Sequence, residues 1–194
     1  MAKNMGKANQ AKQELLSWLR MMFCVIVGTV LLFTLVLRIV RVDGDSMRDT
    51  LQNGDNLIAI SRHLSGELEN GDIVVVQRES FNYGRPIVKR VIAVEGQTVD
   101  IDFEEGIVIV DGEYLDEDYT LEPTWLDEGM PFPLTVPEDS YFLLGDNRNH
   151  SEDSRSLDLG TVSHDEVVGK VILLVVPGES ADSGKREFSR MGLL

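Results

Sequence analysis

The sequence predicts a mainly β protein, an antiparallel barrel or sandwich, preceded by a single N-terminal transmembrane helix. Three observations support this prediction. One long uncharged stretch lies near the N-terminus, many short apolar runs rich in β-branched residues follow it, and glycine, proline and acidic turns separate those runs. The length of 194 residues suits one domain with an appendage.

The uncharged stretch covers residues 21–37, and Ile39 and Val40 extend it past Arg38, whose long side chain can reach the lipid headgroups. A spanning helix needs roughly 20 apolar residues, so the stretch is long enough. Trp18 stands where an interfacial aromatic anchor is expected. No small-residue cleavage motif follows, so we predict an uncleaved signal anchor.

These features divide the chain into four parts. We predict a cytoplasmic segment (residues 1–20), a transmembrane anchor (21–40), an extracytoplasmic domain (41–177) and a flexible tail (178–194). The orientation follows from the excess of basic residues before the anchor over those just after it.

Charge is distributed unevenly along the chain. The formal net charge is −15, yet the first 40 residues hold five basic residues and one acidic residue, so the predicted domain is strongly acidic. An acidic surface argues against nucleic-acid binding, which needs basic groups to neutralise phosphates. The single cysteine, Cys24, lies in the apolar stretch, so neither an intramolecular disulfide nor a catalytic thiol is expected.

Apolar runs bounded by turn residues predict the strands of the domain. The predicted strands are residues 56–60, 73–76, 87–94, 98–101, 107–110, 141–144 and 169–176. We expect 98–101 to pair back onto 87–94.

Residue patterns predict the structure of three connecting segments. Asp111 and Gly112 form a two-residue hairpin signal, and Ser163 with Glu166 forms a capping box for one helical turn. Residues 116–137 are acidic and rich in proline, which indicates a surface excursion.

Two residues could form a nucleophile and its base. Ser46 follows Gly44 in an acidic turn just after the anchor, although such a serine is also common in ordinary turns. Lys89 stands within the apolar strand 87–94, which we expect to be covered on both faces. A desolvated lysine loses affinity for its proton and can then accept one from a serine hydroxyl. Taken alone, the strand favours a lysine whose stem packs and whose amine reaches water.

The loop of residues 145–155 is dense in hydrogen-bonding groups. Ser151 could bond to the lysine amine, while Asp153 and Arg155 could pair and fix the loop. The alternatives are a solvated turn or a weak calcium loop, but the EF-hand spacing is missing, so no metal is expected. His150 offers a weakly supported alternative base.

Four blocks together make the chain similar to the bacterial type I signal peptidases of the Ser–Lys form, especially the short Gram-positive type. The blocks are residues 44–51, 71–75, 88–96 and 145–155, and the resemblance covers about residues 20–176. The last block is the most specific of the four.

The resemblance implies a role for each matching residue. Ser46 would be the nucleophile and Lys89 the general base, with Ser151 orienting the amine. Asp153 and Arg155 would form a supporting salt bridge.

Four further positions have supporting roles in this resemblance. Arg90 and Asp146 would be structural, and Met47 directly follows the nucleophile. Gly44 stands where Gram-negative members have a hydroxyl residue, so the oxyanion hole would depend on backbone N–H groups. Asp49 replaces the proline usual in the family, which frees the backbone beside the nucleophile and adds a charge near the substrate groove.

The implied function is a membrane-anchored serine endopeptidase that removes N-terminal signal peptides from secreted preproteins, with no cofactor. Its partners would be the lipid bilayer and preproteins that carry small residues before the cleavage site. The substrate would lie extended against an edge strand. Apolar residues near Met47 and in residues 125–132 either contact lipid headgroups or pack inside the protein.

Three other functions compete with this one. One is a specialised processing peptidase for a few surface proteins. Another is a catalytically silent, membrane-anchored binding or assembly protein on the same scaffold. Self-cleaving regulators of the SOS type share the Ser–Lys chemistry, but the apolar anchor argues against them.

Overall fold

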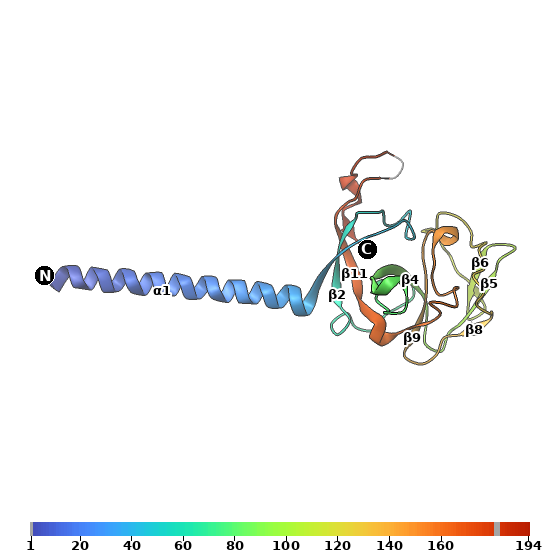
Figure 1. Cartoon of the computed structure of the whole chain (residues 1–194), viewed down its shortest axis with the longest axis horizontal. Coiled ribbons are helices and arrows are strands. Elements are labelled where there is room, and N and C mark those ends of the chain that lie inside the picture. Colours follow the sequence, from blue (N-terminus) through green and yellow to red (C-terminus); the bar gives the residue numbers. More distant parts are fainter. Residues whose placement is uncertain (1, 181–182) are drawn as a thin grey trace. The chain divides into compact units, whose positions relative to one another are not determined.

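The computed structural model describes residues 2–180 and 183–194 (Figure 1). It divides into two compact units, with the boundary between Leu37 and Arg38.

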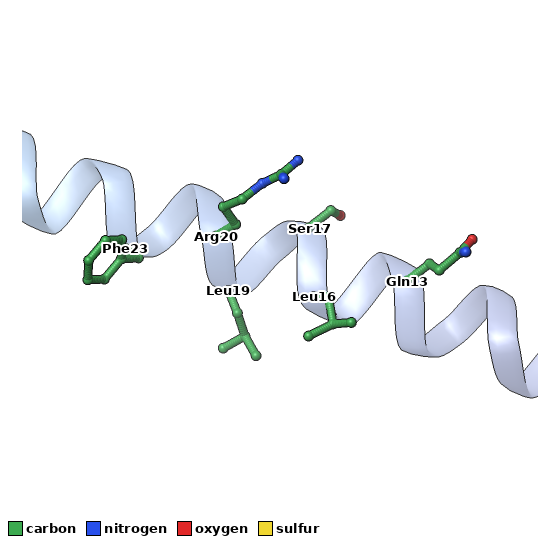
Figure 2. A pocket seen from close by; sticks show the side chains of 6 residues that line it. All are labelled: Gln13, Leu16, Ser17, Leu19, Arg20 and Phe23. Carbon is green, nitrogen blue, oxygen red and sulfur yellow. The ribbon is translucent and has the colours of Figure 1, made fainter.

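The N-terminal unit is one long helix. α1 (Ala2–Leu31) continues into the π-helical turn η1 (Leu32–Val36). The segment Lys12–Val36 has 25 residues and a mean hydropathy of 2.3, so it is long and apolar enough to cross a membrane. In Figure 2, Gln13, Ser17 and Arg20 lie along one side of α1, whereas Leu16, Leu19 and Phe23 point to the other.

The helical segment ends at Val36, before the last residues of the predicted anchor of residues 21–40. At Leu37 the backbone becomes extended (φ −108°, ψ 145°), and Leu37–Arg41 forms strand β1, which pairs with β2. The β-branched Ile39 and Val40 favour this extended conformation. Residues 37–40 thus belong to a strand in the structure, whereas the sequence assigned them to the anchor.

The larger sheet runs in the order β1-β2-β11-β3-β4-β9-β10, with β12 added beside β11. All strand pairs with a described register are antiparallel. Figure 1 shows this order crossing the domain from β2 and β11 to β9. The strands are β2 (Asn56–Ser61), β3 (Ile73–Val76), β4 (Ile87–Val94), β9 (Ser140–Leu144), β10 (Val162–Ser163), β11 (Val167–Val176) and β12 (Gly192–Leu193). The mainly β prediction is confirmed.

The smaller sheet has the order β7-β6-β5-β8. Its strands are β5 (Thr98–Asp102), β6 (Ile107–Val110), β7 (Glu113–Tyr114) and β8 (Leu134–Thr135). Asp111 and Gly112 both have positive φ and close the predicted β6–β7 hairpin. The expected pairing of 98–101 with 87–94 is wrong, because β5 pairs with β6 and β8.

Short 3₁₀ turns complete the domain. The predicted capping box forms at η4, where Ser163 and Glu166 bond reciprocally. The turns are η2 (Asn82–Gly84), η3 (Arg148–His150), η4 (His164–Glu166) and η5 (Phe188–Arg190).

Strand β4 is the centre of the domain. Its residues contribute to three separate apolar clusters: Val88 to one, Val91 to a second, and Ile92 with Ala93 to a third. Six of its eight residues are buried, so the strand is covered on both faces as predicted. Any side chain on its inner positions is therefore removed from bulk water.

Two regions are better packed than the sequence suggested. In the excursion, Thr124 and Val136 are fully buried, and Phe132 packs edge-on against Phe103 and Phe142. Phe132 thus takes the packed alternative, as does Met47, which is 1% exposed.

The described part of the predicted flexible tail is also attached to the domain. Gly192–Leu193 pairs with β11, and Arg190 forms an ion pair of 2.8 Å with the fully buried Asp55. A buried carboxylate needs such a partner, which is why this segment is held. Residues 181–182 lie outside the described residues.

Candidate active site

The loop after β1 presents Ser46 through backbone contacts with the loop after β9. The carbonyl of Ser46 accepts a hydrogen bond from the backbone N–H of Asn147 (3.0 Å), and the Asn147 side chain donates to the carbonyl of Asp45 (3.1 Å). Gly44 has a φ of +103°, a conformation that strongly favours glycine. Within the described residues, the backbone N–H of Ser46 donates no hydrogen bond.

Strand β4 brings Lys89 to the Ser46 hydroxyl. The distance between Lys89 Nζ and Ser46 Oγ is 2.7 Å, although the two residues are 43 positions apart. Lys89 is 3% exposed and lies opposite Val74 of β3. The structure therefore pairs the two residues that the sequence singled out as nucleophile and base.

Burial controls the protonation of Lys89. It lowers the pKa of the Lys89 amine from 10.5 to about 8. The negative charge of Asp153 raises the pKa of the amine, and the positive charge of Arg155 lowers it further. Asp146 and Glu128 also raise the pKa, but more weakly. A large part of the amine is therefore neutral at slightly alkaline pH, as a general base requires.

The predicted supporting residues form a buried network beside the dyad. Arg155 binds both carboxylate oxygens of Asp153 (2.8 and 2.9 Å), and both side chains are fully buried. The Ser151 hydroxyl donates to Asp153 Oδ2 (2.8 Å). The Ser151 hydroxyl is thus bonded to Asp153, whereas the family resemblance implied a bond between Ser151 and the Lys89 amine.

Gly145 is a site residue that the sequence reasoning did not single out. A Cβ there would collide with the Ser151 side chain and the Ser46 carbonyl oxygen. The backbone N–H of Gly145 donates to Asp153 Oδ2 (3.0 Å). The absence of a side chain lets the two loops approach closely, and its position at the start of a polar loop was the available signal.

Arg90 and Asp146 support the opposite face of β4. Arg90 donates to both oxygens of Asp146 (2.8 and 2.7 Å), and its guanidinium lies 4.0 Å from the centre of the Tyr119 ring. Asp146 also accepts from the hydroxyl of Thr50 (2.5 Å). This pair ties the loop after β9 to the turn that follows Ser46.

A small hollow of about 30 Å³ lies beside Ser46. Its lining residues are Arg41, Val42, Asp43, Ser46, Met47, Pro86, Ile87 and Val88. The adjoining edge of β4 is open at residues 87–89, since among the described strands β9 pairs with β4 only from Arg90 onward. An extended chain could add to this edge.

The other candidates from the sequence contribute less. His150 and Asp49 are exposed. Among the described residues, no group of three or more His, Cys, Asp or Glu side chains could hold a metal ion. The chemistry available at this site is that of a serine hydroxyl beside a buried amine.

A family model described as signal peptidase, peptidase S26, matches residues 15–176. The chain belongs to this signal peptidase family. A "Probable signal peptidase I-1" of Synechocystis is 35% identical, and the match covers 70% of this chain and 69% of the relative. "Signal peptidase IB" of Staphylococcus aureus is 32% identical, and the match covers 82% of this chain and 88% of the relative. A solved structure of a signal peptidase I from Enterococcus faecalis is 31% identical and has a TM-score of 0.43. The match covers 54% of this chain and 96% of the solved chain.

The resemblance predicted from the sequence is therefore confirmed, and the chain is a serine peptidase of the signal peptidase family. Within this signal peptidase, the loop block of residues 145–155 supplies Asp146, Asn147, Ser151, Asp153 and Arg155 to the site.

Proposed function

We propose that this chain is a membrane-anchored endopeptidase that removes N-terminal signal peptides from secreted preproteins, with Ser46 as nucleophile and Lys89 as general base. The observation that carries the proposal is the 2.7 Å contact between Lys89 Nζ and Ser46 Oγ in a site where the amine is 3% exposed. A charged, solvated lysine could not accept the serine proton, whereas a desolvated one can.

The reaction follows from this geometry. Ser46 Oγ attacks the scissile carbonyl carbon while its proton passes to Lys89 Nζ. The tetrahedral intermediate collapses, the peptide C–N bond breaks, and Lys89 returns the proton to the leaving amine. Water, deprotonated by Lys89, then attacks the acyl-enzyme ester and releases the signal peptide with a new carboxylate.

The oxyanion of each intermediate would bind the backbone N–H of Ser46. Gly44 contributes no hydroxyl at the position where Gram-negative relatives have one, and its φ of +103° disfavours any residue that could. Because one oxyanion donor is worth about 10² to 10³ in rate in other hydrolases, backbone donors and the dry site must provide the stabilisation.

Substrate selection would follow from the hollow and the open strand edge. The preprotein would lie extended along residues 87–89, making main-chain hydrogen bonds with β4. The hollow beside Ser46 is small, at about 30 Å³, so it favours small side chains. This size agrees with small residues before the cut.

The membrane would hold enzyme and substrate at the same depth. We place residues 1–20 in the cytoplasm and the domain from residue 41 onward outside, because basic residues are more frequent before the apolar segment. The spanning segment would lie within the apolar helical segment Lys12–Val36, after residue 20, and the bilayer would be the partner of this helix. Because enzyme and preprotein are both attached to the same membrane, the effective concentration of the preprotein near the enzyme is raised.

The decisive experiment incubates the full chain, solubilised in detergent, with a secretory preprotein and measures the product masses. We expect cleavage after a small residue by the wild type, no cleavage by Ser46→Ala, and wild-type cleavage by Ser80→Ala, which changes an exposed serine. Cleavage by Ser46→Ala would contradict the proposal.

The same assay separates the alternatives. A panel of preproteins with different signal peptides would be cleaved broadly by a general signal peptidase and at one or two members by a specialised processing peptidase. A folded wild type that cleaves none would support the silent scaffold.

A further inference from the structure

Glu128 belongs to the part of the excursion that lies against the buried network. Its side chain is 16% exposed, and its Oε2 lies 3.8 Å from Arg155 Nε. Within the described residues, Oε2 is buried and accepts no hydrogen bond. A half-buried carboxylate with an unbonded oxygen is costly, so its retention next to the site requires an explanation.

The backbone holds Glu128 in this position from both sides. Arg155 Nη1 donates to the carbonyl of Leu126 (3.0 Å), and the backbone N–H of Met130 donates to the carbonyl of Arg155 (3.0 Å). Gly129 forms an antiparallel bridge with Ser156. The segment is therefore fixed to the residues around Arg155 on each side of the carboxylate.

The charges near Lys89 do not balance when Glu128 is included. Four charged side chains act on the Lys89 amine: Asp153, Arg155, Asp146 and Glu128. Asp153 is paired with Arg155, and Asp146 with Arg90. Glu128 has to share Arg155 with Asp153, so it is the carboxylate whose charge is not compensated.

We propose that Glu128, which the Arg155–Asp153 pair holds beside the site, is a positioning residue whose charge acts on Lys89 and so sets the pH range in which the dyad is active. This inference rests on the proposed function of Ser46 and Lys89. Ionised Glu128 favours the charged amine, and protonated Glu128 favours the neutral amine that the reaction needs.

The two groups titrate in overlapping ranges. Burial raises the pKa of Glu128 to about 7, and the negative charges of Asp153 and Glu152 act in the same direction. Arg155 and a hydrogen bond from the backbone N–H of Asp153 oppose this rise. As pH falls below the pKa of Lys89, Glu128 begins to bind a proton and opposes protonation of the amine. Coupled groups of this kind lose their protons over a wider pH range than a single group.

The test compares pH profiles of kcat/KM for preprotein cleavage by the full chain. Glu128→Gln should shift the acid limb to lower pH by about 0.3 unit or more, because it removes a negative charge that favours the charged amine. It should also make the limb steeper. Glu128→Asp keeps the charge and should stay closer to the wild type. Asp127→Asn, which removes an exposed neighbouring charge, should leave the limb unchanged.

A measurement without catalysis completes the test. The ¹³Cε NMR signal of Lys89, assigned by its loss in Lys89→Arg, reports the amine protonation directly. We expect a broadened titration in the wild type and a narrower one at lower pH in Glu128→Gln. Unchanged titration and profile in Glu128→Gln, or an equal shift in Asp127→Asn, would overturn the inference alone.

Failure of the proposed function looks different. A wild type that cleaves nothing at any pH would contradict the peptidase assignment, whereas the NMR titration would still decide the coupling. If Glu128→Gln does not fold, a wild-type Lys89 titration that fits one independent proton would overturn the inference.

Discussion

Lys89 and Arg90 are neighbours on strand β4, and both are almost fully buried, yet their surroundings differ completely. Arg90 faces a carboxylate that binds it through two hydrogen bonds, a backbone carbonyl and an aromatic ring. Lys89 faces a serine hydroxyl, and no carboxylate binds its amine directly within the described residues. Arg90 is therefore paired with a negative charge, whereas the Lys89 amine has no such direct partner among the described residues.

The difference teaches that burial alone does not decide how a basic residue is used. A guanidinium cannot lose its proton in a protein, so a buried arginine needs a compensating carboxylate. An amine can become neutral at a moderate cost, so a lysine without a direct partner can serve as a base. One strand thus presents a structural cation on one face and a proposed general base on the other.

The largest expected effect on activity comes from replacing Lys89 with arginine, the residue type found at position 90. Lys89→Arg keeps the length and charge of the side chain but removes the ability to become neutral. We expect a loss of about 10⁴-fold or more in kcat/KM for preprotein cleavage at every pH. Substantial activity at high pH in this variant would contradict the role of Lys89, provided that thermal unfolding shows a folded domain.

The second test removes the partner of Arg90. Asp146→Ala leaves a buried guanidinium without its carboxylate, so we expect a loss of about 3–5 kcal/mol in the free energy of unfolding. Chemical denaturation of the full chain measures this loss. The double variant Arg90→Met with Asp146→Ala should lose less than the single variant, because no uncompensated charge remains. An equal or larger loss would show that the charge is not the cause.

The smallest effect concerns the spacing between the two loops at the site. In Gly145→Ala the new methyl group pushes Ser151 and the Ser46 carbonyl apart, so we expect kcat/KM to fall by about 10- to 100-fold and stability by about 1–3 kcal/mol. Gly192→Ala is the matched control, because a Cβ there meets no atom within 4 Å. Wild-type activity in Gly145→Ala would mean that this close approach is not required.

Local sequence patterns predicted the elements that depend on neighbouring residues. The strand of residues 87–94, the Asp111-Gly112 hairpin and the Ser163–Glu166 capping box all appear as expected. In each, the signal and the structure lie within a few positions. The strand of residues 37–41 was not predicted, because Leu37, Ile39 and Val40 suit both a lipid-facing helix and a strand.

The site depended on contacts between distant parts of the chain. Strand periodicity alone favoured a solvated Lys89, and only the match of four blocks to a known family brought it next to Ser46. Gly145 and Asn147 were missed because their role depends on which loop they touch. The position of Glu128 could not be foreseen either, since a single acidic residue in an acidic, proline-rich segment carries no local signal.

The ion pair between Arg190 and Asp55 has a consequence for biosynthesis. The Asp55 carboxylate lies in the turn just after the Ser46 loop and accepts from the backbone N–H groups of Gln52 and Gly178 as well as from Arg190. The ribosome makes Asp55 long before Arg190, so the partner that Asp55 needs when it becomes buried is missing throughout most of translation. The domain can therefore complete its folding only after Arg190 has left the ribosomal exit tunnel.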